Sequence, residues 1–171
     1  MVIAAPTNTT NGDQPTILVK NHCNATLKIG YSKDVDYFGT VVDVSAGSSY
    51  TIHPSVGWSG RVWGRKSCSG DKCYDSGMGS PASLAEFHFL DSGNTFYDIS
   101  FVDGFNLPMV VEPASKNEYC CTGAYNGQNL CHGNQYTEQV KDVCPDVYSY
   151  AYDDATSVFT CGTRSFTVTI C

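Results

Sequence analysis

The chain has 171 residues, enough for one domain with a full hydrophobic core. Its formal net charge of −7 and its sequence pI of about 4.8 argue against nucleic-acid phosphates as a partner. No segment approaches the roughly 20 apolar residues of a membrane-spanning helix. An acidic surface of this kind suits neutral glycans or basic proteins.

The N-terminal segment, residues 1–15, is rich in Thr, Asn and Pro, and we expect it to be flexible. Its first ten residues, MVIAAPTNTT, are too short for a signal peptide and look like a mature start behind an initiator Met. The rest of the chain, residues 16–171, is predicted to form a single domain.

Short apolar alternations follow one another between turn signals, and each predicts a β-strand. They are TILVK (16–20), ATLKIGY (25–31), SSYTIH (48–53), GRVWGRK (60–66), SLAEFHFL (83–90), TFYDISFV (95–102), LPMVVE (107–112) and SFTVTIC (165–171). Strands at this spacing indicate an all-β sandwich or barrel. Helical spacing is present only in YTEQVKDVC, residues 136–144.

Nine cysteines are too many for a typical cytosolic protein, and their spacing does not match a zinc site. Disulfides in an oxidising, secretory setting are the better interpretation, and we expect no metal or other cofactor. The sequons at Asn8 and Asn24 agree with secretion and with a glycoprotein. Because nine is odd, at least one cysteine has no partner within the chain.

Two regions show how disulfides would be used. Residues 115–135 are polar and glycine-rich, contain three cysteines and predict a disulfide-tied lobe rather than a second domain. Cys23 follows the first predicted strand, and Cys171 ends the last one. A bridge between them would tie the chain ends in adjacent strands and, on the chain-entropy model, stabilise the fold by roughly 4–5 kcal/mol.

Several longer stretches, in this order, together resemble the thaumatin-like family, which includes osmotin and pathogenesis-related antifungal proteins. They are VKNHCNATL, GRVWGRKSC, LAEFHF, YDISFVDGFNLPM, EYCCTGAYN, CPDVYSYAYDDATSVFTC and FTVTIC. The resemblance covers most of the chain from about residue 15. It implies an antiparallel β-sandwich with a disulfide-rich lobe beside it, and an acidic cleft in which several members bind β-1,3-glucans.

The sequence departs from the family pattern at the lobe. Only VVEPASKN separates the FNLPM and EYCC blocks, where full-length members have a long cysteine-rich segment. The resemblance therefore implies a small form with one cleft wall largely missing. It implies the disulfides Cys23–Cys171, Cys68–Cys73 and Cys121–Cys131. The pairing of three further cysteines stays open: Cys120, Cys144 and Cys161.

The family's cleft carries one Arg, one Glu and three Asp. Matched block by block, these are Arg61, Glu86, Asp98, Asp103 and Asp153 in this sequence. The resemblance implies that all five bind glycan. If the protein is a glucanase, Glu86 is the candidate proton donor and Asp98 the second catalytic carboxylate.

Strand alternation supports part of this set independently. Glu86 and Asp98 each fall on the face opposite an apolar one, so both point away from the expected core. Asp103 begins a DGFN turn, which would have to curl back toward Asp98 for the two to meet. The alternative is that Asp103 and Asp153 are ordinary turn residues and that Arg61 is a surface cation.

The leading functional hypothesis is a secreted, monomeric, defence-type protein of the apoplast or cell wall, with an antifungal role in plant defence. Its partner would be β-1,3-glucan or a related cell-wall polysaccharide. Two alternatives remain open. One is a weak endo-β-1,3-glucanase, although binding without catalysis is favoured. The other is an inhibitor that binds a secreted glycosidase such as a xylanase.

Overall fold

The computed structural model describes residues 14–34, 36, 38–77, 79–114, 120–121 and 158–171. In these parts the chain forms short strands and one 3₁₀ turn, η1 (Gly70–Cys73). The strands are β1 (Thr16–Asn21), β2 (Leu27–Lys33), β3 (Thr40–Val44), β4 (Ser49–Ile52), β5 (Ser59–Arg65), β6 (Leu84–Phe89), β7 (Thr95–Ser100), β8 (Met109–Pro113), β9 (Cys120–Cys121), β10 (Phe159–Cys161) and β11 (Ser165–Ile170).

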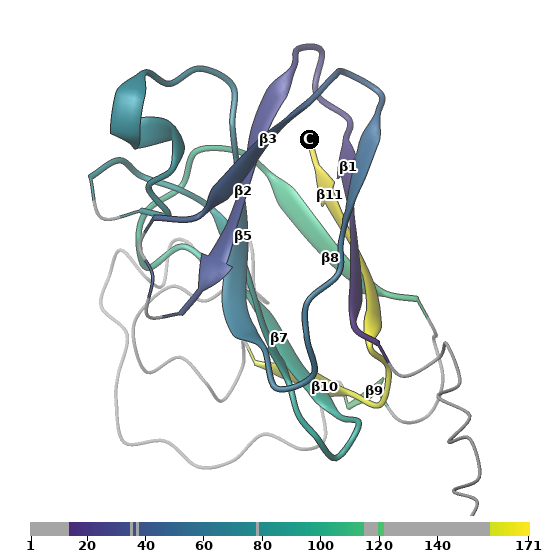
Figure 1. The fold of residues 1–171 in the computed structure, drawn as a ribbon. Helices are drawn as coiled ribbons and strands as arrows, with labels where there is room; N and C mark the ends of the chain where they lie inside the picture. The colour runs from purple at the N-terminus through teal and green to yellow at the C-terminus, as the bar shows by residue number, and fades with distance from the viewer. Residues whose placement is uncertain (1–13, 35, 37, 78, 115–119, 122–157) are drawn as a thin grey trace, which may run out of the picture.

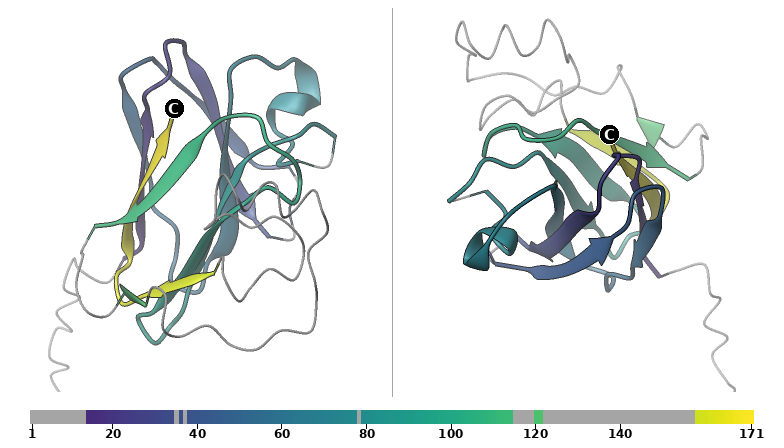
Figure 2. Two further views of the ribbon diagram at one scale, coloured as in Figure 1. Left: turned by 180° about the vertical axis from the view of Figure 1, so that it is seen from behind. Right: turned by 90° about the horizontal axis from the view of Figure 1, so that it is seen from above.

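Two sheets pack face to face, so the predicted all-β sandwich is confirmed (Figures 1 and 2). The smaller sheet has the order β4-β1-β11-β8, and the larger has the order β3-β2-β5-β6-β7-β10-β9. The pairing of β1 with β11 is parallel, whereas the other strand pairs among the described residues are antiparallel. The first and last strands thus lie side by side.

The main core lies between the sheets and is built from alternate strand residues. Phe87 is its centre: its ring lies 5.9 Å from the ring of Phe89 and 5.3 Å from that of Phe166. Tyr97 approaches Phe166 from the neighbouring strand, at 5.0 Å between ring centroids. Burial of such a side chain stabilises the fold by about 1.5–3 kcal/mol, so this cluster fixes which face of the larger sheet points inward.

A second, smaller cluster lies on the other face of the larger sheet, which we call the outer face. Trp63 is fully buried there with Ala82 and Leu84. A Cβ atom on Gly30, which is opposite Trp63 in the register, would lie 2.1 Å from the indole. A side chain at position 30 is therefore incompatible with this position of the indole.

The segment that covers Trp63 is held down by Arg65. This buried guanidinium donates hydrogen bonds to the backbone carbonyls of Asp75, Ser80 and Pro81 at 2.8–3.0 Å. The Asp75 carboxylate in turn accepts the backbone N–H groups of Gly77 and Gly79. Because buried charged groups are costly unless hydrogen-bonded, these contacts fix the loop against the sheet.

Disulfides close two parts of the structure. Cys23 is bonded to Cys171, which ties the ends of β1 and β11, and Cys68 is bonded to Cys73 across η1. Cys161 is also disulfide-bonded. The side chains of Cys120 and Cys121, together with Cys131 and Cys144, lie outside the described residues, as does the bridge predicted between Cys121 and Cys131.

Each of the predicted alternations contains a strand. Three described strands were not predicted from the sequence: β3, β9 and β10. The predicted helix at 136–144 lies outside the described residues, as do most of the predicted N-terminal segment and lobe. No helix in the described ranges is long and apolar enough to cross a membrane.

Candidate functional site

A polar row crosses the outer face of the larger sheet. Arg61 on β5 is directly opposite Glu86 on β6, and Glu86 is directly opposite Asp98 on β7. Directly opposite residues have Cβ atoms about 4.5–5.5 Å apart and point to the same face. The strand register therefore brings these three predicted site residues together.

Arg61 lies at one end of the row and contacts acidic residues from three parts of the chain. Its Nε lies 3.6 Å from Oε1 of Glu86, and its Nη1 lies 3.8 Å from Oδ2 of Asp103. Its Nη2 donates a hydrogen bond to the backbone carbonyl of Asp34 at 3.2 Å. The Arg61 side chain is only 13% exposed, so one partly buried guanidinium organises three acidic residues.

Asp103 reaches this row because the chain turns back after β7. The N–H of Gly104 donates to the carbonyl of Phe101 at 2.9 Å, which closes the turn, and Gly104 has a positive φ of 96°. The backbone carbonyl of Asp103 accepts the N–H of Ala82 at 3.2 Å. These bonds hold the Asp103 carboxylate toward Arg61 over the outer face, although the residue also has the turn position that its Asp-Gly sequence suggests.

Asp34 is a residue of this site that the sequence did not reveal. It follows β2, in which Ser32 is directly opposite Arg61. Its carboxylate accepts a hydrogen bond from the hydroxyl of Ser59. In the sequence Asp34 lies in a polar stretch that is typical of an ordinary loop. Only the pairing of β2 with β5 places it beside the row.

The pKa of Glu86 is raised above its ordinary value, mainly because burial disfavours the charged carboxylate. Asp34 and Asp103 raise it further through repulsion, whereas Arg61 and a hydrogen bond with Ser100 lower it. Burial and repulsion outweigh the ion pair. Glu86 therefore keeps its proton to a higher pH than an ordinary glutamic acid does.

A second row lies beside the first on the outer face. His88 is opposite Ser59 on one side and opposite Phe96 on the other, and both His88 and Phe96 are exposed. The phenyl ring of Phe96 is an apolar surface next to the carboxylates.

The remaining predicted residues lie elsewhere. Asp153 and Asn8 are outside the described residues, so the fifth member of the predicted set has no described position. Asn24 is exposed in the turn between β1 and β2, where a glycan would meet no steric obstacle from the core. In the described ranges, no group of three or more His, Cys, Asp and Glu side chains has the arrangement of a metal site.

The structure thus defines the class of protein as a disulfide-linked β-sandwich with a basic residue among carboxylates on one sheet. Comparison with known proteins identifies its family. The Thaumatin family model matches residues 21–116 and 114–171. The chain belongs to the thaumatin family. The two matched segments meet at residues 114–116, where the sequence places the shortened lobe.

Curated relatives agree with this assignment. Thaumatin-like protein 1 of Arabidopsis thaliana is 31% identical over 226 aligned positions, which cover 93% of this chain and 86% of that protein. A protein of Prunus avium named glucan endo-1,3-beta-glucosidase is 30% identical, over 91% of this chain and 90% of that protein. The first alignment is longer than the chain itself, so part of that relative has no counterpart here.

Solved structures confirm the fold. The thaumatin-like xylanase inhibitor TLXI superposes with a TM-score of 0.58 at 19% identity, over 91% of this chain and 98% of that one. The protein elicitor MoHrip2 from Magnaporthe oryzae gives a TM-score of 0.50 at 14% identity, over 92% of this chain and 98% of that one. The predicted thaumatin-like sandwich is thus correct.

Proposed function

We propose that the protein is a secreted, defence-type protein whose acidic row binds β-1,3-glucan of cell walls. The observation that carries the proposal is the register that aligns Arg61, Glu86 and Asp98, with Asp103 held over them. Secretion is supported by the disulfides and by the exposed sequon at Asn24. The predicted antifungal role would follow from binding to fungal glucan.

The chemistry of the row suits a neutral sugar. Ionised carboxylates accept hydrogen bonds from hydroxyl groups, and the Arg61 guanidinium donates them. The exposed ring of Phe96 offers an apolar surface to a sugar face. A strand-based row of this kind is rigid, which lowers the entropic cost of binding.

Co-sedimentation with insoluble β-1,3-glucan tests the proposal, with cellulose and xylan as control polymers. The variant Asp98→Asn/Asp103→Asn removes two charges from the site. Its matched control, Asp91→Asn/Glu112→Gln, removes two charges from exposed positions elsewhere. We expect glucan-selective binding by the wild type and the control, and at least a tenfold loss in the site variant, since hydrogen bonds to charged groups contribute about 1.5–3 kcal/mol each.

Binding of equal strength to all three polymers, or equal loss in both double variants, would contradict a specific acidic site. Absence of glucan binding in the wild type would contradict the proposal as a whole.

A weak endo-β-1,3-glucanase is a second candidate because the pKa of Glu86 is raised. A carboxyl group that keeps its proton can act as a general acid, and Asp98 on the adjacent strand would be the second carboxylate. The name of the Prunus avium relative points the same way. This candidate predicts slow release of reducing sugars from soluble glucan that disappears in Glu86→Gln and is retained in the control variant.

Inhibition of a secreted glycosidase is the alternative outcome, and the similarity in fold and extent to TLXI motivates it. An inhibitor would form a complex with a xylanase in size-exclusion chromatography, and the acidic-row variant would bind as well as the wild type. That result, together with no glucan binding, would replace the glucan proposal.

A further inference from the structure

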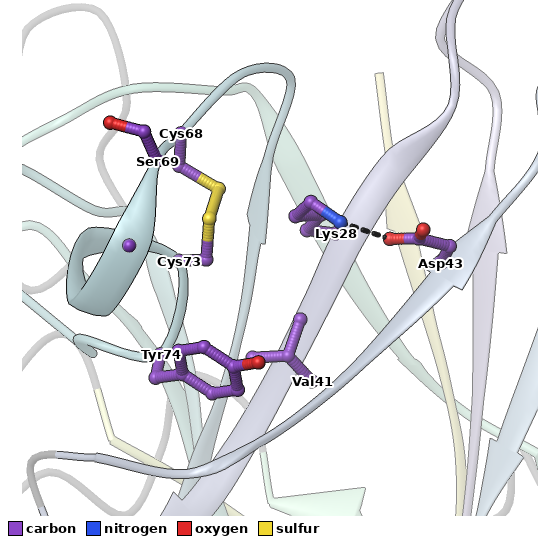
Figure 3. A pocket seen from close by; sticks show the side chains of 8 residues that line it. Lys28, Val41, Asp43, Cys68, Ser69, Cys73 and Tyr74 are labelled. Atoms are coloured by element: carbon purple, nitrogen blue, oxygen red, sulfur yellow. Dashed lines mark hydrogen bonds and ion pairs between the residues drawn. A yellow bond between two sulfur atoms is a disulfide. The ribbon is translucent and has the colours of Figure 1, made fainter.

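A cavity of about 470 Å³ lies on the outer face of the larger sheet, away from the acidic row (Figure 3). The ends of β2 and β3 that bear Lys28, Val41 and Asp43 form one side. The segment around η1 forms the other, with the Cys68–Cys73 disulfide and Tyr74. The volume falls within the roughly 300–1,000 Å³ of small-molecule sites.

The chemistry of the lining is mixed. Lys28 Nζ and Asp43 Oδ1 form an ion pair at 2.6 Å, so the two charges of this wall offset each other and do not select an ion of either sign. Both groups keep further hydrogen-bonding capacity, one as a donor and the other as an acceptor. Tyr74 is 47% exposed and adds an aromatic face and a hydroxyl group. Donors, acceptors and an aromatic face together match a neutral sugar ring.

Two features pre-form the cavity. The Cys68–Cys73 disulfide closes the loop of η1, and the carbonyl of Tyr74 accepts the N–H of Gly39 at 3.1 Å. A bridge between Phe38 and Asp75 continues this pairing. The backbone that carries Tyr74 is therefore attached on both sides, and a ligand would bind without having to order the wall.

The cavity and the acidic row share one face of the sheet. Lys28 is four residues before Ser32 on β2, and Arg65 is four residues after Arg61 on β5. Residues an even number apart in a strand point to the same side, and four residues span about 13 Å. This distance is within the length of one extended glycan, which would have to pass over the segment that covers Trp63.

We propose that this cavity is a second carbohydrate site, in which Tyr74 stacks on a sugar ring and the Lys28–Asp43 pair binds its hydroxyl groups. The inference takes its ligand class, β-1,3-linked glucose, from the proposed function. Simultaneous occupation of the two sites would raise the affinity for long chains above that for short ones.

The test is an amide ¹H–¹⁵N titration of the full chain, disulfides intact, with β-1,3-linked glucotriose and glucohexaose. Cello-hexaose serves as the control sugar. We expect shifts in two separate groups of amides, around η1 with β2–β3 and along β6–β7. Tyr74→Ala should abolish the shifts around η1, keep those along β6–β7, and weaken glucohexaose binding roughly tenfold.

Two further variants sharpen the test. Tyr74→Phe keeps the ring and should retain the shifts around η1. Val110→Ala removes an exposed apolar side chain from the smaller sheet and should change nothing. Because the Gly39 bond uses the backbone of Tyr74, the alanine variant keeps the wall, which a well-dispersed amide spectrum would verify.

The outcomes separate the two proposals. Shifts along β6–β7 alone would overturn the second site and leave the acidic site intact. Shifts around η1 alone would support the second site and contradict the proposed function. An unchanged spectrum at all sugar concentrations would overturn both.

Discussion

The two faces of the larger sheet are built from the same strands and have opposite chemistry. On β6, Phe87 packs inward against two phenyl rings, while its neighbour Glu86 points outward to Arg61. On β7, Tyr97 is buried, and its neighbour Asp98 joins the acidic row. Strand alternation thus places a residue of the core and a residue of the proposed binding row at successive positions in the chain.

This contrast indicates that the acidic row lowers the stability of the folded protein. The core rings contribute by burial, whereas the acidic row gathers like charges around a single guanidinium and partly buries one of them. Substitution of a core ring and substitution of Glu86 should therefore change stability in opposite directions.

The largest effect is expected for Phe87→Ala on the inner face. Removal of this buried ring leaves a cavity between the sheets, and such changes cost about 3–5 kcal/mol. Urea unfolding followed by intrinsic fluorescence would measure the loss. A change below 1 kcal/mol would contradict the central place of Phe87 in the core.

Gly30→Ala should have the next largest effect, although it adds a single methyl group. The new Cβ would lie 2.1 Å from the fully buried Trp63 indole, and overpacking of this kind costs about 1–3 kcal/mol. A lower urea midpoint with altered near-ultraviolet circular dichroism of Trp63 is the expected result. Unchanged stability would mean that the small cluster on the outer face tolerates the displacement of its indole.

Glu86→Gln should stabilise the protein at neutral pH. Because folding raises the pKa of Glu86 above 4.5, the folded state favours the protonated carboxyl group. The contribution of Glu86 to stability is complete below the pKa that this group has in the unfolded chain. It is lost as the pH rises through the higher pKa of the folded state. Urea midpoints from pH 3 to pH 8 should therefore diverge in favour of the variant as the pH rises. A difference in urea midpoint between the variant and the wild type that stays constant from pH 3 to pH 8 would contradict the raised pKa of Glu86.

Phe96→Ala is expected to have the smallest effect, and it is the matched partner of Phe87→Ala. Both change a phenylalanine to alanine on neighbouring strands, yet Phe96 is 40% exposed on the outer face and Phe87 only 3% on the inner one. Surface substitutions of this kind usually change stability by less than about 0.5 kcal/mol. The same urea series would measure this change. A loss larger than this value would contradict the prediction and show that Phe96 belongs to a packed cluster.

The fold was largely predictable from the sequence because the alternations at β6 and β7 are clear. The strand β3 was missed although Val41, Val42 and Val44 are β-branched, because turn signals around it dominated the pattern. The parallel pairing of β1 with β11 was not predicted, since register between chain ends depends on the whole topology.

The site was predictable to a smaller extent. The resemblance to the thaumatin-like family predicted three residues of the row: Arg61, Glu86 and Asp98. Strand alternation independently predicted that the two acidic side chains point outward. Asp34 was missed because its place beside Arg61 depends on the pairing of strands far apart in the chain. The cavity beside Tyr74 was missed for the same reason: its walls come from two separate segments.

The most direct test of the account measures stability and glucan affinity together in Glu86→Gln at pH 7. If the acidic row binds glucan at the expense of stability, the affinity should fall about tenfold while the urea midpoint rises. The variant Tyr74→Ala provides a baseline, because it should lower the affinity for glucan without raising the urea midpoint. Unchanged affinity, or a fall in both quantities, would contradict the account.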